Sequence, residues 1–158
     1  MIGYFAMLDG EELKGLRDGS IEMEAFLSRI VLEEERCIDI DKAWAGLRYL
    51  LLGGREGPGP GAVDPVLGGK ALGEEDAGYG PARTLAPDEV RSASEALGAV
   101  DFDGLRGLFR ETVLGNPEVY PCYEDEEDFN YLEYNFGVLK DFFSRCAAAG
   151  KDMLLFIA

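Results

Sequence analysis

The spacing of apolar residues changes within residues 36–52, RCIDIDKAWAGLRYLLL, which contain the single tryptophan of the chain. Apolar and polar positions alternate up to position 41, which indicates a strand with one buried face. From position 43 onward apolar residues recur at three- and four-residue steps, which is typical of a helix. A second stripe of this helix carries Asp41, Ala45 and Arg48, because seven residues return to about the same helix angle. We expect the segment to organise the fold. Its second stripe is a candidate border of a binding site.

Two short apolar runs predict strands that lie beside each other. Residues 1–8, MIGYFAML, are apolar and aromatic, and residues 153–158, MLLFIA, form a similar run after Gly150. Runs of this length without alternation are typical of strands buried on both faces. We expect the first run to form a central strand and the second run to pair next to it.

Helical spacing covers much of the remaining chain. Asp9 and Glu12 have the spacing of a capping box, which predicts that a helix begins there. Apolar residues at three- and four-residue steps predict the other helices, at about residues 20–34, 87–98, 102–109 and 125–150. The elements together predict a single compact α/β domain over residues 1–158, dominated by helices. In it, several helices flank a small mixed sheet in a three-layer-like arrangement.

Two segments rich in glycine and proline interrupt these elements. Residues 53–61, GGREGPGPG, predict a flexible surface loop and match no glycine-rich phosphate-binding motif. Residues 63–87 show little regular pattern, and segments of that length are typically functional or disordered. Turn chemistry at residues 78–81 presents Tyr79 and, close by, Arg83. These two side chains either belong to a binding site or fill the edge of the core.

The charge balance limits the possible partners. The chain has 31 acidic and 15 basic residues and a formal net charge of −16. Nucleic acid and anionic membranes are therefore not expected as partners, because no cluster of basic residues offsets the repulsion. An acidic surface either keeps a protein in solution or attracts a basic partner. Since no export signal or membrane-spanning run is evident, we expect a cytoplasmic location.

The residue types restrict the possible chemistry. Histidine is absent, which excludes histidine-dependent catalysis and histidine-bound metals. Cys37, Cys122 and Cys146 are far apart in the sequence, so we expect buried thiols rather than a disulfide or a zinc site. The acidic run at residues 124–128 predicts a helix cap and not a metal site. No catalytic residue, cofactor or metal is predicted.

Several segments together resemble the YfbM-like family of small uncharacterised bacterial proteins. They are MIGYFAML, IDIDKAWAGLRYLLLGG, VLGGKALGEEDAGYGPARTLAPDEV, the Glu-Val-Tyr-Pro turn at residues 118–121, and the last helix with its following strand. The resemblance covers essentially the whole chain and implies a compact α/β domain with no assigned activity. It also implies histidines at the positions that Ala45 and Arg48 occupy here.

These observations leave three hypotheses about function. The first is a non-enzymatic cytoplasmic interaction protein that binds a basic protein, as in the neutralisation of a toxin. The second is a binding or catalytic pocket for a planar anionic ligand, in which five side chains converge: Trp44, Arg48, Tyr79, Arg83 and Tyr120. The third is hydrolysis by the carboxylates of Asp39 and Asp41, which a continuing strand would point in opposite directions.

Overall fold

One five-stranded sheet lies at the centre of the structure. The computed structural model describes residues 1–158, together with all side chains except those of residues 74–76. The strand order is β2-β1-β5-β4-β3. The strands are β1 (Gly3–Leu8), β2 (Cys37–Asp39), β3 (Lys70–Asp76), β4 (Pro81–Leu85) and β5 (Asp152–Ile157). All neighbouring strands pair antiparallel. The prediction of a mixed sheet is therefore wrong. Residue spacing predicts which side chains are buried, but not the direction in which neighbouring strands run.

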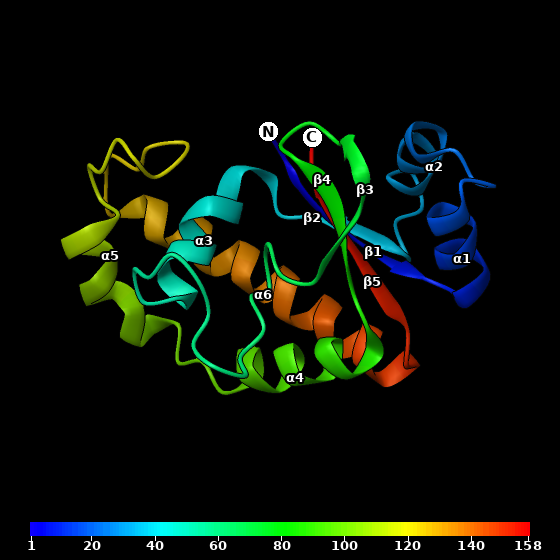
Figure 1. The fold of residues 1–158 in the computed structure, drawn as a ribbon. Coiled ribbons are helices and arrows are strands. Elements are labelled where there is room, and N and C mark those ends of the chain that lie inside the picture. Colours follow the sequence, from blue (N-terminus) through cyan, green and yellow to red (C-terminus); the bar gives the residue numbers. More distant parts are fainter.

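Strands β1 and β5 lie side by side in the middle of the sheet, as the two apolar runs predict (Figure 1). They pair over six residues, from Gly3 opposite Ile157 to Leu8 opposite Asp152. Helices cover both faces of the sheet, so neither strand needs a polar side. This explains why both segments are almost continuously apolar.

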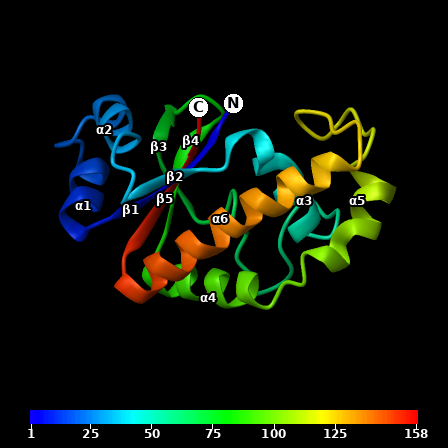
Figure 2. The same cartoon turned by 180° about the vertical axis from the view of Figure 1, so that it is seen from behind.

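Six α-helices form two layers, one on each side of the sheet (Figures 1 and 2). The first layer consists of α1 (Gly10–Asp18) and α2 (Met23–Ile30). The second consists of α3 (Trp44–Leu51), α4 (Pro87–Gly98), α5 (Arg106–Thr112) and α6 (Glu127–Ala149). Short 3-10 helices precede α3 and α5, at Asp41–Ala43 and Asp103–Leu105. The predicted three-layer arrangement is confirmed. None of these helices is long and apolar enough to cross a membrane.

The apolar stripe of α6 forms a large part of the larger core, which lies between the sheet and the second layer. Its predicted inner residues are all buried: Phe129, Leu132, Phe136, Leu139, Phe143 and Cys146. They pack with residues of α3, α4, β1 and β5 in one cluster. Trp44 belongs to the same cluster and is 5% exposed. The prediction that residues 36–52 organise the fold agrees with this position.

The smaller core lies between the sheet and the first layer. Phe26 and Ile30 of α2 and Leu13 and Leu16 of α1 pack there against the opposite face of the sheet. The predicted capping box is confirmed, since the N–H of Glu12 donates to Asp9 Oδ1 at 2.8 Å and the N–H of Asp9 donates to Glu12 Oε2 at 3.1 Å. Helix α2 is shorter than the predicted 20–34 because Glu22 caps its start and turns follow Ile30.

Residues 63–87 contain a β-hairpin, contrary to the expectation of a largely irregular segment. Strands β3 and β4 pair antiparallel, with a change of register between Ala71 and Asp76. Gly73, within the strand, has a φ of 82°. An irregular strand of this kind loses the strict alternation on which a sequence-based prediction depends. Residues 53–61 form turns and bends, in agreement with a loop, and their flexibility stays a prediction.

Replacing Gly46 with alanine should destabilise the protein by about 2 kcal/mol, because overpacking of a core has costs of this size. An added Cβ would lie 2.5 Å from Tyr123 Oη, and the ring of Tyr123 is itself buried. Urea denaturation, monitored by circular dichroism, measures the change in the free energy of unfolding.

Gly137→Ala in α6 is the matched control for this substitution. No atom lies within 4 Å of its added Cβ, so alanine should stabilise the helix by up to about 1 kcal/mol. Equal stabilities of the Gly46 and Gly137 variants would show that the contact with Tyr123 does not constrain α3.

Candidate functional site

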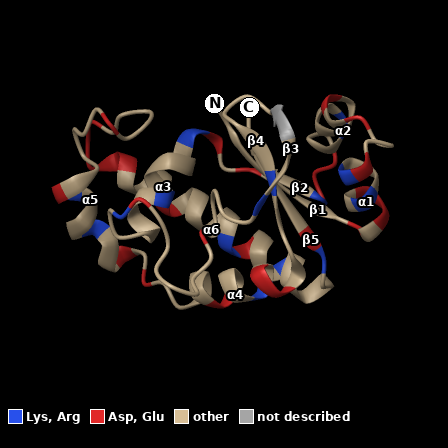
Figure 3. Ribbon diagram, viewed as in Figure 1, with Lys and Arg blue, Asp and Glu red and all other residues tan. Residues whose placement is uncertain are grey.

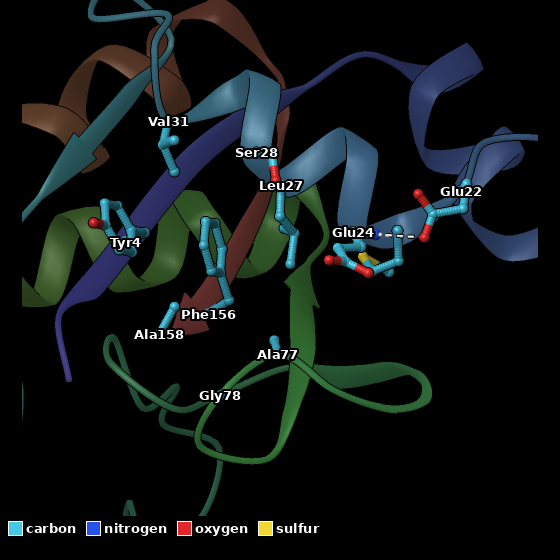
Figure 4. A pocket seen from close by; sticks show the side chains of 11 residues that line it. Tyr4, Glu22, Glu24, Leu27, Ser28, Val31, Ala77, Gly78, Phe156 and Ala158 are labelled. Atoms are coloured by element: carbon cyan, nitrogen blue, oxygen red, sulfur yellow. Dashed lines mark hydrogen bonds between the residues drawn. The ribbon is translucent and has the colours of Figure 1, made fainter.

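The largest of the described cavities is a cleft of about 680 Å³ on the side of the sheet that carries α1 and α2 (Figure 4). Three segments that are far apart in the sequence line it. They are α2 with its flanking residues, the adjoining ends of β1 and β5, and the turn that joins β3 to β4. We call this cavity the α2 cleft. Its volume is in the range of natural ligand-binding sites.

Two aromatic side chains form the floor of the α2 cleft. Tyr4 of β1 and Phe156 of β5 are direct neighbours in the strand register. Their rings stack with centroids 5.0 Å apart and planes inclined by 15°. Phe156 is buried, whereas Tyr4 is partly exposed. The floor is therefore mostly apolar, and the pairing of two central strands places its two rings side by side.

Helix α2 supplies one wall of the cleft. Leu27 points from this wall toward Ala77 of the hairpin turn, which also includes Gly78, and Val31 points toward the floor (Figure 4). All four residues are only partly buried or exposed, so apolar surface stays open to solvent. The hairpin turn is held beside β5 because the N–H of Tyr79 donates to the Ile157 carbonyl at 3.0 Å. The hairpin turn, which forms the opposite wall, is therefore bonded to β5, the strand that also carries Phe156 of the floor.

The rim of the cleft is acidic at the start of α2. Glu22 and Glu24 both line the cavity and are exposed. Glu22 also caps α2, since its carboxylate accepts from the N–H groups of Glu24 at 3.0 Å and Ala25 at 2.6 Å. This cap fixes the position of one negative charge on the rim. Glu24 makes no side-chain hydrogen bond or ion pair among the described residues, so its carboxylate is available for a partner.

The hydroxyl of Tyr4 stays neutral at physiological pH. Burial raises the pKa of this group above its ordinary value, and the nearby carboxylates of Asp39 and Asp41 and the thiol of Cys37 raise it further. A neutral phenol both donates and accepts hydrogen bonds. The cleft floor thus offers one polar atom that carries no charge near neutral pH.

The structure brings three of the five predicted ligand-binding residues together. Trp44 lies beside Tyr79 and Tyr120, with ring centroids 5.2 Å and 5.9 Å away. Tyr79 is 54% exposed, whereas Trp44 is buried. The indole Nε1 of Trp44 is also buried and has no hydrogen-bond partner among the described residues. The rings fill the space between them, and none of the described cavities is lined by all three.

The two predicted arginines bind other parts of the chain. Arg48 Nε donates to Asp64 Oδ2 at 2.6 Å, and its Nη2 donates to the Glu56 carbonyl at 2.7 Å. Arg48 therefore connects α3 to the loop that follows it, through an ion pair with Asp64. Asp64 is 4% exposed, which makes this pair part of the framework.

Arg83 also has a structural role. Its Nε donates to the Gly68 carbonyl at 3.1 Å and its Nη2 to the Gly69 carbonyl at 2.8 Å. A Cβ on Gly69 would lie 2.1 Å from the Thr84 carbonyl oxygen, so glycine is required for this close approach. Arg83 and Tyr79 share a cavity of about 120 Å³. An anion there would have to compete with two carbonyl groups for the guanidinium, and the anionic-ligand site stays a prediction without added support.

The remaining candidate groups have local partners. The N–H of Asp41 donates to Asp39 Oδ1 at 3.0 Å, and the Tyr131 hydroxyl donates to Asp41 Oδ2 at 3.0 Å. At the start of α6, Asp128 accepts from the N–H groups of Glu124 and Asp125, which precede the helix, whereas the N-cap residue Glu126 makes no side-chain capping hydrogen bond. Among the described side chains, no group of three or more acidic or cysteine residues could hold a metal ion.

The cysteines differ in exposure. Cys37 and Cys146 are buried, as expected, and burial raises the pKa of each thiol to about 12. Cys122 is exposed, so the prediction of a buried thiol is wrong at this position. It follows Pro121 in a turn at the surface, where the local sequence has no periodicity from which exposure could be predicted.

The residues of the α2 cleft were not predicted as a site from the sequence. Tyr4 and Phe156 belong to apolar runs, whose expected role is the core. Leu27 belongs to the inner stripe of a helix, and Glu22 and Glu24 belong to its polar face. The sequence gives no signal for this cleft, because its spacing predicts a helix over residues 20–34, whereas α2 of the structure is shorter and leaves part of the sheet uncovered.

Comparisons with known proteins agree with the resemblance inferred from the motifs. A family model described as "Domain of unknown function (DUF1877)" matches residues 1–156. Among solved structures, the chain is similar to YfbM from Escherichia coli, which is described as a protein of unknown function. The two are 28% identical with a TM-score of 0.73, over 98% of each chain. No curated protein matches the chain. The predicted YfbM-like fold is thereby confirmed.

Thiol labelling should distinguish Cys122 from the other two cysteines. In the folded protein, one thiol should react quickly with an aromatic disulfide reagent, because only Cys122 is exposed. All three should react after unfolding in urea. A Cys122→Ser variant should lack the fast phase. A second fast thiol in the folded wild-type protein would contradict the burial of Cys37 and Cys146.

Proposed function

The chain belongs to the DUF1877 family, for which no function is described, and we propose its function from the α2 cleft: a non-enzymatic protein that binds a basic segment of a partner protein there. The observation that carries the proposal is the combination of an aromatic floor with an acidic rim. A lysine or arginine has an apolar stem and a cationic end. Its stem suits the rings of Tyr4 and Phe156, and its charge suits Glu24.

The charges around the cleft support a cationic partner. Among the described ion pairs, Arg29 and Arg36 are both paired with Glu12 and Glu33. These two arginines are thus neutralised within the layer, whereas Glu22 and Glu24 make no described ion pair. Figure 3 shows that acidic residues are distributed over both helical layers. The net charge of −16 adds a long-range attraction that raises the rate of encounter with a basic protein.

The apolar surface of the cleft supports a peptide segment over a simple cation. Leu27, Val31 and Ala77 add aliphatic surface to the two rings. A small hydrated cation has no use for such a surface, whereas a peptide with alternating basic and apolar residues buries its apolar side chains there. Electrostatics then select the partner, and apolar burial holds it. A cytoplasmic location is part of this proposal, because the cytoplasm keeps thiols reduced, including the two buried thiols of this protein.

Replacing Glu24 with lysine should weaken the binding of a cationic peptide about tenfold, which equals about 1.4 kcal/mol. The substitution places a positive charge on the rim that the proposal assigns to the cation. The probe is a fluorescently labelled peptide of alternating lysine and leucine, titrated by fluorescence anisotropy at low and high salt. Binding by the wild-type protein should be saturable and weaker at high salt.

Glu95→Lys is the matched control. Glu95 is exposed on α4, in the other helical layer, and the substitution changes the net charge by the same amount. It should leave the dissociation constant nearly unchanged. Ser28→Trp is a second test, since this exposed residue lines the cleft and a tryptophan would fill it without altering the charge. Equal effects of Glu24→Lys and Glu95→Lys, or no saturable binding by the wild-type protein, would contradict the proposed function.

A further inference from the structure

A third carboxylate lies beside the aromatic floor of the α2 cleft. Asp39 of β2 is the register partner of Tyr4 in β1. The two side chains therefore share one face of the sheet, with their Cβ atoms about 5 Å apart. The strand order β2-β1-β5 places Asp39 on the side of Tyr4 that faces away from Phe156. Its charge also contributes to the raised pKa of the Tyr4 hydroxyl. Asp39 thus borders the floor at the edge of the sheet.

The carboxylate of Asp39 is available for a partner. The side chain is exposed, and only its Oδ1 has a described hydrogen bond, which it accepts from the N–H of Asp41 at 3.0 Å. Asp39 takes part in none of the described ion pairs. The neighbouring carboxylate of Asp41 accepts from the Tyr131 hydroxyl, and Lys42 is exposed without a described ion pair. Two carboxylates and one ammonium group leave this end of the cleft negative.

The α2 cleft therefore has carboxylates at both ends and rings between them. Figure 4 shows Tyr4 and Glu24 at opposite ends of the cleft, with Phe156 between them. Asp39 lies beyond Tyr4, and Glu22 lies beside Glu24 on the rim. Among the described residues that line the cavity, none is basic. Because neighbouring strands are about 4.8 Å apart, Asp39 and Phe156 are separated by roughly 10 Å across the sheet. One lysine or arginine side chain cannot contact both ends at once.

From this arrangement we infer that the α2 cleft binds an extended segment with two basic residues on one face, one at Asp39 and one at Glu24, and an apolar residue between them over the rings. The inference rests on the proposed function and specifies its partner, since it adds a second cation that Glu24 alone does not require. In an extended peptide alternate residues face the same side, so the three side chains belong at the first, third and fifth positions. The first and fifth Cα atoms are about 14 Å apart, which is enough to reach past the floor.

The test compares two fluorescently labelled peptides by anisotropy. Both have lysine first, leucine third and alanine second and fourth, and the fifth residue is lysine in one peptide and glutamine in the other. The wild-type protein should bind the two-lysine peptide about fivefold more tightly, which is the upper range for an exposed ion pair. In Asp39→Asn this preference should fall to about twofold, the statistical advantage of two lysines for one site. The asparagine keeps the oxygen that accepts from the N–H of Asp41.

Asp141→Asn is the matched control, since Asp141 is exposed on α6 in the other helical layer and the same charge is lost. It should keep the fivefold preference. An Asp39→Asn variant that keeps this preference, or a wild-type protein that binds both peptides equally, would overturn the inference while leaving the proposed function intact. A wild-type protein that binds neither peptide, nor the alternating lysine and leucine peptide, would overturn both. Circular dichroism confirms that each variant is folded.

Discussion

Strands β1 and β5 come from distant parts of the sequence, and their antiparallel pairing over six residues holds both helical layers in position. The pair Phe5 and Leu155 belongs to the larger core, whereas the next pair, Ala6 and Leu154, belongs to the smaller core. Because successive side chains of a strand face opposite sides, a slip of one residue would exchange these two sets. One strand register therefore determines where α1 and α2 pack and where α3 to α6 pack.

The α2 cleft is a consequence of the same register. It places Tyr4 opposite Phe156 on the face that the first helical layer covers. That layer is small, since α1 and α2 have nine and eight residues, whereas α6 alone has 23. Two short helices do not cover the end of the sheet, so the aromatic pair becomes the floor of an open cleft. The proposed function thus depends on a mismatch in size between the two layers, and no special backbone geometry is needed.

Sequence patterns predicted the elements in which one period continues over several turns or a whole strand. Helix α6, the two central strands and the capping box of Asp9 are of this kind, because local spacing alone determines them. The β3–β4 hairpin was missed since its register change removes the alternation. The predicted roles of Arg48 and Arg83 depend on partners such as Asp64 and Gly69, which only the tertiary structure identifies. The α2 cleft was missed for a related reason, as spacing predicts which face of an element is inward but not how far the opposite layer extends.

Binding is proposed in the α2 cleft and not over the acidic surface as a whole. An amide NMR titration of the protein with the alternating lysine and leucine peptide tests this most directly. We expect the largest chemical-shift changes at residues 22–31, 77–78 and 156–158, which are distant in the sequence and adjacent only around the α2 cleft. Changes concentrated at the acidic start of α6, residues 124–128, with unchanged signals around the cleft, would contradict binding in the cleft.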